Sequence, residues 1–237
     1  MSMYVLKKKS EIEKARVILK ERNISCTDTW LERFIRIMRL SGDLPVGDEV
    51  KSWDVLKTIQ FIEENIGNHS EILDIGAYAS EIPCILHRLG YINIKGIDLN
   101  AEIKRMPHAD SIKYIVSDFM KTPFKEGSFR VITAISVIEH GFIGSSLFSE
   151  ISRILCPGGY FLASFDYWKD KIDTSGVILF GLDWKIFSYM EVKEILCEAS
   201  KYNLFPYGSI DYEVNERPIE FMGKNYTFAL MILKKIG

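Results

Sequence analysis

A chain of 237 residues, of which 47% are hydrophobic and 26% charged, can form one large α/β domain or two small ones, and its composition excludes the disordered and fibrous classes. The formal net charge is −2, whereas a protein that acts mainly on nucleic acid carries a basic surface. Basic residues cluster only near the two ends, at 7–9 and 234–235, so we expect no nucleic-acid partner.

The cysteines and the apolar runs indicate an ordinary intracellular protein. Four cysteines, at 26, 84, 156 and 197, show no C-x-x-C spacing, so no zinc or redox site is predicted and we expect no metal. The N-terminus lacks the apolar core of a signal peptide, and the longest wholly apolar run, 228–233, is too short to cross a bilayer. We therefore expect a soluble, cytoplasmic protein without membrane contact.

The first 70 residues have helical periodicity. Leu31, Phe34, Ile35 and Met38 form one apolar stripe behind a capping box of Thr29 and Glu32, and residues 55–66 form another. Residues 41–47 have the composition of a loop. We predict an N-terminal helical lid over 1–68, packed on a compact domain that spans 69–237.

From residue 71 onward, short apolar strands alternate with helices. The late helix begins at a capping box of Ser188 and Glu191. This alternation predicts an α/β fold with a doubly wound, seven-stranded, mostly parallel sheet covered on both faces. Two final strand-like pieces, 209–214 and 226–233, predict an antiparallel C-terminal hairpin at the sheet edge. The other predicted strands are 72–75, 92–99, 112–116, 130–136 and 160–165, and the helices between them are 80–89 and 147–155.

Ligands of doubly wound sheets bind beyond the carboxyl ends of the strands, so the residues at those ends are candidates for a site. Gly76 follows the first strand, where the missing side chain lets a ligand approach the backbone. Asp98 follows about twenty residues later, the interval at which an acid meets ribose hydroxyls. The loop has one glycine of G-x-G-x-x-G and no Walker lysine, so neither NAD nor ATP fits well.

These motifs resemble the class I S-adenosylmethionine (SAM)-dependent methyltransferases. Leu73–Gly76 is similar to the start of the family's first motif, and Leu155–Gly159 is similar to its L-x-P-G-G turn. The resemblance implies SAM as cofactor, ribose binding by Asp98, adenine binding by Asp118 with Phe119 beside the ring, and a pocket segment after the fourth strand. The cofactor-binding residues it implies are Asp74, Gly76, Ala77, Tyr78, Asp98, Leu99, Asp118, Phe119 and Ser136.

The chain departs from the family in its first motif. Tyr78 and Ser80 stand where the family usually has its second and third glycines. The Tyr78 ring either crowds the methionine end of the cofactor or lines the pocket, and the sequence leaves both alternatives open.

Methyl transfer to a hydroxyl or amine requires an acceptor held in line and a group that takes its proton. His140 is the one of four histidines expected at a strand end that faces the pocket, and the alternative is a loop-capping histidine. Asp166, which closes the fifth strand, is the second candidate base, and it too has an alternative role as a cap.

An aromatic segment, 166–190, follows the fifth strand. Tyr167, Trp168 and Trp184 are candidate acceptor-binding residues, because stacked aromatic rings suit sugars or flat scaffolds. Ordinary packing under a long loop is the alternative.

We therefore predict a SAM-dependent methyltransferase that acts on a hydroxyl or amine of a small-molecule or saccharide acceptor. Two alternatives stay open. One is a degenerate methyltransferase fold that serves as a non-catalytic binding or scaffold subunit, and the other is an RNA or protein methyltransferase.

Overall fold

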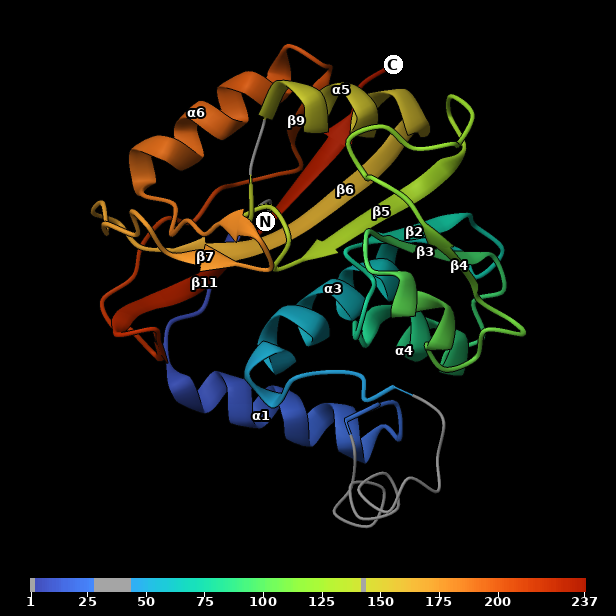
Figure 1. Cartoon of the computed structure of the whole chain (residues 1–237), viewed down its shortest axis with the longest axis horizontal. Helices are drawn as coiled ribbons and strands as arrows, with labels where there is room; N and C mark the ends of the chain where they lie inside the picture. Colours follow the sequence, from blue (N-terminus) through green and yellow to red (C-terminus); the bar gives the residue numbers. More distant parts are fainter. Residues whose placement is uncertain (1–2, 28–43, 142–143) are drawn as a thin grey trace.

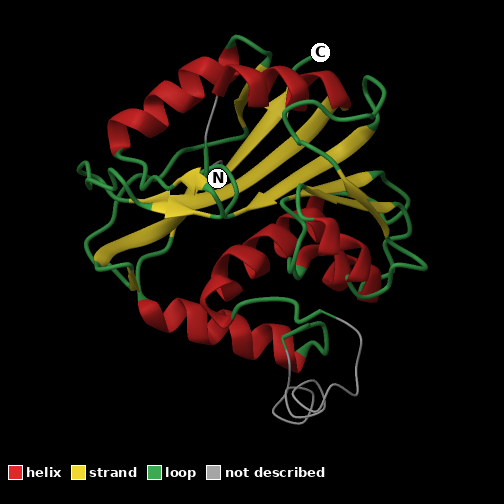
Figure 2. Ribbon diagram, in the orientation of Figure 1, coloured by secondary structure: helices red, strands yellow, loops and turns green. Residues whose placement is uncertain are grey.

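The computed structural model describes residues 3–27, 44–141 and 144–237. The helix predicted around Leu31–Met38, with its capping box at Thr29, lies outside the described residues. A twisted central sheet is covered on one face by α5 and α6 and on the other by α1, α3 and α4 (Figures 1 and 2). This three-layer arrangement is the predicted α/β architecture.

Five parallel strands form the half of the sheet that carries the strand-end motifs. Their order is β6-β5-β2-β3-β4, so the chain changes direction of winding between β2 and β5. Ile75 of β2 is level with Ile97 of β3 and Ala134 of β5, which brings three carboxyl ends together at this point. The strands are β2 (Ile72–Ile75), β3 (Ile94–Asp98), β4 (Lys113–Val116), β5 (Phe129–Ile135) and β6 (Leu155–Tyr167).

The C-terminal strand β11 (Lys224–Lys235) pairs antiparallel with β6 from Thr227 to Lys234. It forms the predicted antiparallel hairpin, but its partner is β10 (Ile219–Phe221), not residues 209–214. It also lies inside the sheet, because β1 (Met3–Val5) and β9 (Leu204–Pro206) both pair with its outer edge. Seven strands were predicted, and the described residues form a nine-stranded sheet, because the strand expected at 209–214 does not form and β1, β9 and β10 are added.

The helices follow the predicted apolar periodicity. α3 (Ser52–Asn65) buries Val55, Ile59 and Ile62, and the described turn before it is a 3-10 helix, η1 (Glu49–Lys51). The Ser188–Glu191 capping box is present at the start of α6. The remaining elements are α1 (Lys9–Glu21), α4 (Ile82–Arg88), η2 (Ala101–Arg105), α5 (Gly144–Ile154), α6 (Tyr189–Ser200) and the hairpin of β7 (Ile178–Leu179) and β8 (Leu182–Asp183).

Helices on both faces explain why the central strands are apolar throughout rather than alternating. All four residues of β2 are buried, as are nine consecutive residues at the end of β6. Among the described residues, no helix has the length and apolar character that spanning a membrane requires.

Candidate cofactor and acceptor site

A pocket of about 590 Å³ opens at the carboxyl ends of β2, β3 and β5, where the chain reverses its winding. Its volume is within the range of small-molecule sites. Six of the predicted cofactor residues line it together: Gly76, Tyr78, Asp98, Leu99, Phe119 and Ser136.

Two unusual backbone conformations shape this pocket. Gly76 has a φ of +68°, and a Cβ atom there would lie 2.3 Å from Cγ2 of Val137. Ser136 has a φ of +52°, and its amide donates to the carbonyl and the hydroxyl of Ser164, each at 3.1 Å. The loops after β2 and β5 therefore approach each other more closely than a side chain at Gly76 would allow.

The Asp98 carboxylate is fixed at the end of β3. Its Oδ2 accepts from the Tyr78 amide at 3.2 Å, and its Oδ1 accepts from the Asn100 amide at 2.8 Å. Phe119 reaches the same pocket from the loop after β4. This places a charged acceptor and an aromatic ring on one wall.

The other predicted cofactor residues lie beside or beneath the pocket. Asp118 is exposed and its Oδ1 accepts from the Met120 amide, which caps the loop after β4. Asp74 is buried, accepts from Oγ1 of Thr133 at 2.6 Å, and has a pKa raised by burial to about 7. Ala77 is buried, and its amide donates to the carbonyl of Ile97. Asp74 and Ala77 hold the loop that carries Gly76 and Tyr78.

Tyr78 stands between two hollows. The second is a smaller pocket of about 170 Å³, which shares Gly76, Tyr78 and Ile135 with the first. Lys51 and Ser80 also line it. The Tyr78 side chain, 37% exposed, is thus a wall common to both hollows.

His140 lines the larger pocket, and its ring makes an edge contact of 5.3 Å with Phe180 at the tip of the β7–β8 hairpin. Burial, followed by the charge of Lys51, lowers the pKa of His140 to about 4. The imidazole is therefore neutral at physiological pH, and Nδ1 has no hydrogen-bond partner among the described residues. A neutral imidazole can accept a proton.

Asp166 lies deeper, at the end of β6. Its Oδ2 accepts from Nε1 of Trp184 at 2.8 Å, and its Oδ1 is 3.8 Å from Nζ of Lys51. Two more buried acids, Asp54 and Glu139, interact electrostatically with it. Sequence reasoning assigned no role to Lys51, Asp54 or Glu139, although Glu139 directly precedes His140 in the strand-end segment.

The aromatic residues predicted to bind the acceptor are buried. The Tyr167 hydroxyl donates to the carbonyl of Tyr212, and the Trp168 ring is covered by Arg217 at 4.3 Å. Neither residue lines a described pocket. Trp184 does, in a hollow of about 780 Å³ under the β7–β8 hairpin that also contains Glu139.

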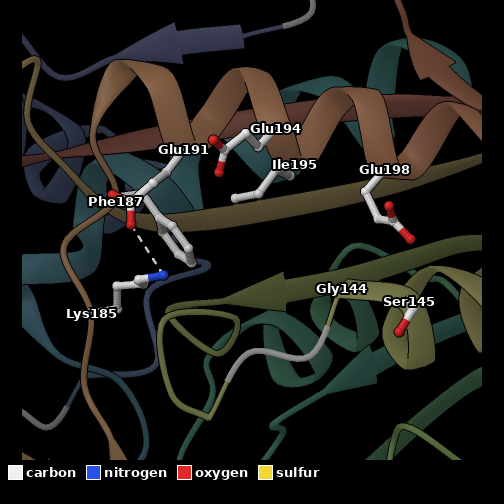
Figure 3. A pocket seen from close by; sticks show the side chains of 8 residues that line it. All are labelled: Gly144, Ser145, Lys185, Phe187, Glu191, Glu194, Ile195 and Glu198. Carbon is white, nitrogen blue, oxygen red and sulfur yellow. Dashed lines mark ion pairs between the residues drawn. The ribbon is translucent and has the colours of Figure 1, made fainter.

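Another hollow, of about 370 Å³, lies between α5 and α6 (Figure 3). Three glutamates of α6 line it, and one of them, Glu191, pairs with Lys185 at 3.1 Å. Lys171 also pairs with Glu191, at 2.8 Å. None of the predicted site residues lines this hollow, so we assign it no role in the cofactor site.

Comparison with known proteins identifies the domain that carries this pocket. Residues 73–163 match the family model described as a methyltransferase domain. This stretch begins in β2, ends in β6 and contains every lining residue of the pocket except Phe180 and Leu182. The chain contains a class I SAM-dependent methyltransferase domain.

Relatives of this methyltransferase domain include a sterol 24-C-methyltransferase from Pneumocystis carinii, 33% identical over 104 residues. That match covers 40% of this chain and 27% of the relative, so the chain spans well under two thirds of the relative's length. A SAM-dependent methyltransferase from Methanosarcina mazei has a TM-score of 0.57, 19% identity and coverage of 74% of this chain and 97% of its own. Geranyl diphosphate C-methyltransferase from Streptomyces coelicolor, solved with S-adenosylhomocysteine (SAH), has a TM-score of 0.57, 16% identity and coverage of 84% and 87%.

The residues of the methyltransferase domain fit SAM. The close backbone approach at Gly76 leaves room where a Cβ would clash, the fixed Asp98 carboxylate offers two acceptors, and Phe119 offers a ring face. The cationic methionine end of SAM, its ribose and its nucleobase match these three features in turn.

Proposed function

We propose that this chain binds SAM at the ends of β2, β3 and β5 and transfers its methyl group to a small-molecule acceptor. The observation that carries the proposal is the Asp98 carboxylate, fixed by two backbone amides opposite Gly76 in a pocket that Phe119 also lines. SAM, when bound, supplies an electrophilic methyl group on a sulfonium. The chain's residues then bind and orient the acceptor and take its proton.

The proposed acceptor has an apolar body and carries a hydroxyl or amine. Phe180, 90% exposed, and Leu182, 40% exposed, form an apolar rim where the hairpin borders the cofactor pocket. The relatives' names refer to a sterol and to geranyl diphosphate, both with hydrocarbon bodies. A saccharide has less support, because Tyr167 and Trp168 are buried and leave Trp184 as the one predicted stacking residue beside a pocket.

We assign the role of proton acceptor to His140 in preference to Asp166. His140 lines the pocket and is neutral at physiological pH, whereas the Asp166 carboxyl is 3% exposed and engaged by Trp184. Carbon is the second candidate acceptor atom, since the names of both relatives specify C-methylation. If the acceptor atom belongs to a hydroxyl, His140→Ala should slow its methylation and leave cofactor binding nearly unchanged.

Calorimetric titration with SAM and, separately, SAH tests the cofactor assignment. We expect binding by the unchanged protein and at least about tenfold weaker binding by Asp98→Ala, which loses charge-assisted hydrogen bonds to the ribose. Asp110→Ala, an exposed aspartate outside the pocket, is the matched control. A folded protein that binds neither ligand would contradict the proposal and favour the non-catalytic scaffold.

The same titration on Tyr78→Gly resolves the question that the first motif leaves open. If the ring crowds the cofactor, removing it joins the two hollows that Tyr78 separates and tightens SAM binding. If the ring lines the bound cofactor, its loss weakens binding. We expect tightening, because Tyr78 occupies the wall between both hollows.

A further inference from the structure

A cluster of charged residues is buried between α3, β5 and β6. We call Lys51, Asp54, Glu139 and Asp166 the carboxyl cluster; they come from η1, α3, the loop after β5 and the end of β6. The three acids are 0%, 1% and 3% exposed in that order, and the Lys51 side chain is 22% exposed. Buried carboxyl oxygens normally each have a hydrogen-bond partner, so a buried oxygen without one requires an explanation.

The carboxyl cluster has fewer hydrogen-bond donors than its buried oxygens can accept. Asp166 receives the Trp184 N–H, and Oδ2 of Asp54 receives the Ser164 hydroxyl at 2.9 Å. Oδ1 of Asp54 and Oε2 of Glu139 have no partner on another residue among those described. Both atoms are fully buried, so the structure leaves acceptor capacity unused inside the molecule.

The cluster also lacks positive charge. Lys51 is the cation that lowers the pKa of all three acids, and its Nζ also lies 3.6 Å from the centre of the Phe228 ring. Burial outweighs this effect and raises each pKa, to about 7 for Asp54. Because one ammonium balances one carboxylate, the cluster retains protons at neutral pH.

A hydrogen-bond chain links the cluster to the cofactor pocket. Ser164 donates to Asp54 and accepts from the amide of Ser136, which lines that pocket. Lys51 lines the smaller hollow on the other side of Tyr78. Glu139 precedes His140, another lining residue, so Lys51, Asp54 and Glu139 each line one of the two hollows or connect to a residue that does.

We propose that the carboxyl cluster is the counter-charge for a cationic group bound in the adjoining pockets, and that it releases a proton when that cation arrives. The inference rests on the proposed function, and the cation to which we assign it is the SAM sulfonium. An arriving positive charge favours the ionised carboxylates, so one carboxyl O–H breaks and its proton leaves to solvent. SAH, a neutral thioether, brings no such charge, so the cluster favours SAM over its product.

Other titratable groups surround the cluster, and proton release by the cluster must be distinguished from proton release by these groups. His140 is already neutral at physiological pH and has no imidazolium proton to release, and Tyr226 of β11 holds its proton because burial raises its pKa. The groups that face the cluster are Lys51 from η1, Asp54 from α3, Glu139 and His140 from the loop after β5, Asp166 from β6 and Tyr226 from β11.

Calorimetry in two buffers of different ionisation enthalpy, phosphate and Tris, counts the protons released. At neutral pH we expect SAM to release a large fraction of one proton more than SAH does. The ratio of SAM to SAH affinity should rise by roughly tenfold as the cluster ionises with increasing pH, the equivalent of about one pKa unit. Equal proton release by SAM and SAH, with both bound, would overturn the inference.

Substitutions within the carboxyl cluster test whether its members release the proton. Glu139→Gln should remove most of the excess proton release and lower the SAM-to-SAH ratio, while SAH binding, which reports folding, persists. Asp54→Asn is the second variant if Glu139→Gln does not fold. Glu150→Gln is the matched control, because Glu150 is also buried but lies on α5, where it pairs with Arg153. An unchanged response in both cluster variants would overturn the inference.

Two further outcomes distinguish a failure of the proposed function from a failure of the sulfonium assignment. If neither SAM nor SAH binds, the proposed function fails before this inference is reached. Tetramethylammonium chloride, added to the SAH complex, tests whether an acceptor ammonium is the cation: proton release there but not with SAM would overturn the sulfonium assignment. Release with SAM alone supports it.

Discussion

Two buried charged networks join the N-terminal segment to the rest of the domain, and they are built on opposite principles. The first is the Arg16–Glu81 pair, in which the guanidinium donates to both oxygens of one carboxylate at 3.0 and 2.8 Å. The second is the carboxyl cluster, in which Lys51 faces three acids and approaches one of them, Asp166, to 3.8 Å. One network has a cation for its single acid, and the other has one cation for three acids.

The partners of the two networks show the same contrast. Arg16 also donates to the Ser52 hydroxyl and the Asp48 carbonyl, and Glu81 accepts from the Cys26 amide. Every charge there is met by fixed hydrogen bonds, as a structural ion pair requires. The carboxyl cluster keeps unused oxygens, which is an expensive arrangement unless a ligand meets them. A satisfied network indicates structure, and an unsatisfied one beside a pocket indicates function.

The largest expected effect comes from breaking the satisfied network. Arg16→Met leaves the Glu81 carboxylate buried at 2% exposure without its cation, which should lower the free energy of unfolding by about 3–5 kcal/mol. Urea denaturation measures this. Lys20→Met, which removes an exposed pair with Glu49, should change stability little. A small loss in Arg16→Met would mean that the two networks do not differ as described.

The unsatisfied network should respond to pH instead. The pKa of Asp54 is raised by burial from an ordinary 3.8 to about 7, so the folded state binds more protons than the unfolded state between those values. Stability that is present below about pH 4 is therefore lost as pH rises through 7, by roughly 2–4 kcal/mol. Asp54→Asn should flatten this dependence and gain relative stability at high pH. Parallel stability profiles of the two proteins would contradict the pKa assignment.

The difference between the networks also marks the limit of what the sequence predicts. Gly76, Asp98 and Phe119 were found because each follows a strand, and the carboxyl ends of parallel strands converge whatever packs around them. Asp54 and its hydrogen-bond partner Ser164 are 110 residues apart, and only the packing of α3 against the sheet brings them together. No local pattern carries that information, so the sequence predicted no role for Lys51 or Asp54.

The same reasoning explains the one misplaced strand. Periodicity predicted a strand at 209–214 but not its partner, and the edge of β11 is taken by β1 and β9. Ile210 makes a single bridge to Met3 instead. Similarly, the apolar pattern at Tyr167 and Trp168 fits both core and binding surface, and the structure buries both residues.

A smaller loss of stability should follow from removing one hydrogen-bond donor to the carboxyl cluster. Trp184→Phe keeps most of the ring but deletes the N–H that meets Oδ2 of Asp166 at 2.8 Å, at a cost of about 1–3 kcal/mol. Thermal unfolding followed by circular dichroism measures the loss. Trp53→Phe is the matched control, because Nε1 of Trp53 is buried without a described partner and its removal breaks no hydrogen bond. Equal losses in the two variants would show that packing, not the donor, is responsible.

The smallest expected effect concerns the link between the cluster and the cofactor pocket. Ser164→Ala deletes the hydroxyl that meets Oδ2 of Asp54, which should cost about 1 kcal/mol in urea denaturation. Because that hydrogen bond favours the ionised acid, its loss raises the pKa of Asp54 and moves the fall in stability to higher pH. Thr58→Val, which removes a buried hydroxyl without a described partner, should leave the pH profile in place. If Ser164→Ala leaves it in place too, Asp54 is not coupled to the pocket through Ser164, and the excess proton release by SAM must reach the cluster through Glu139.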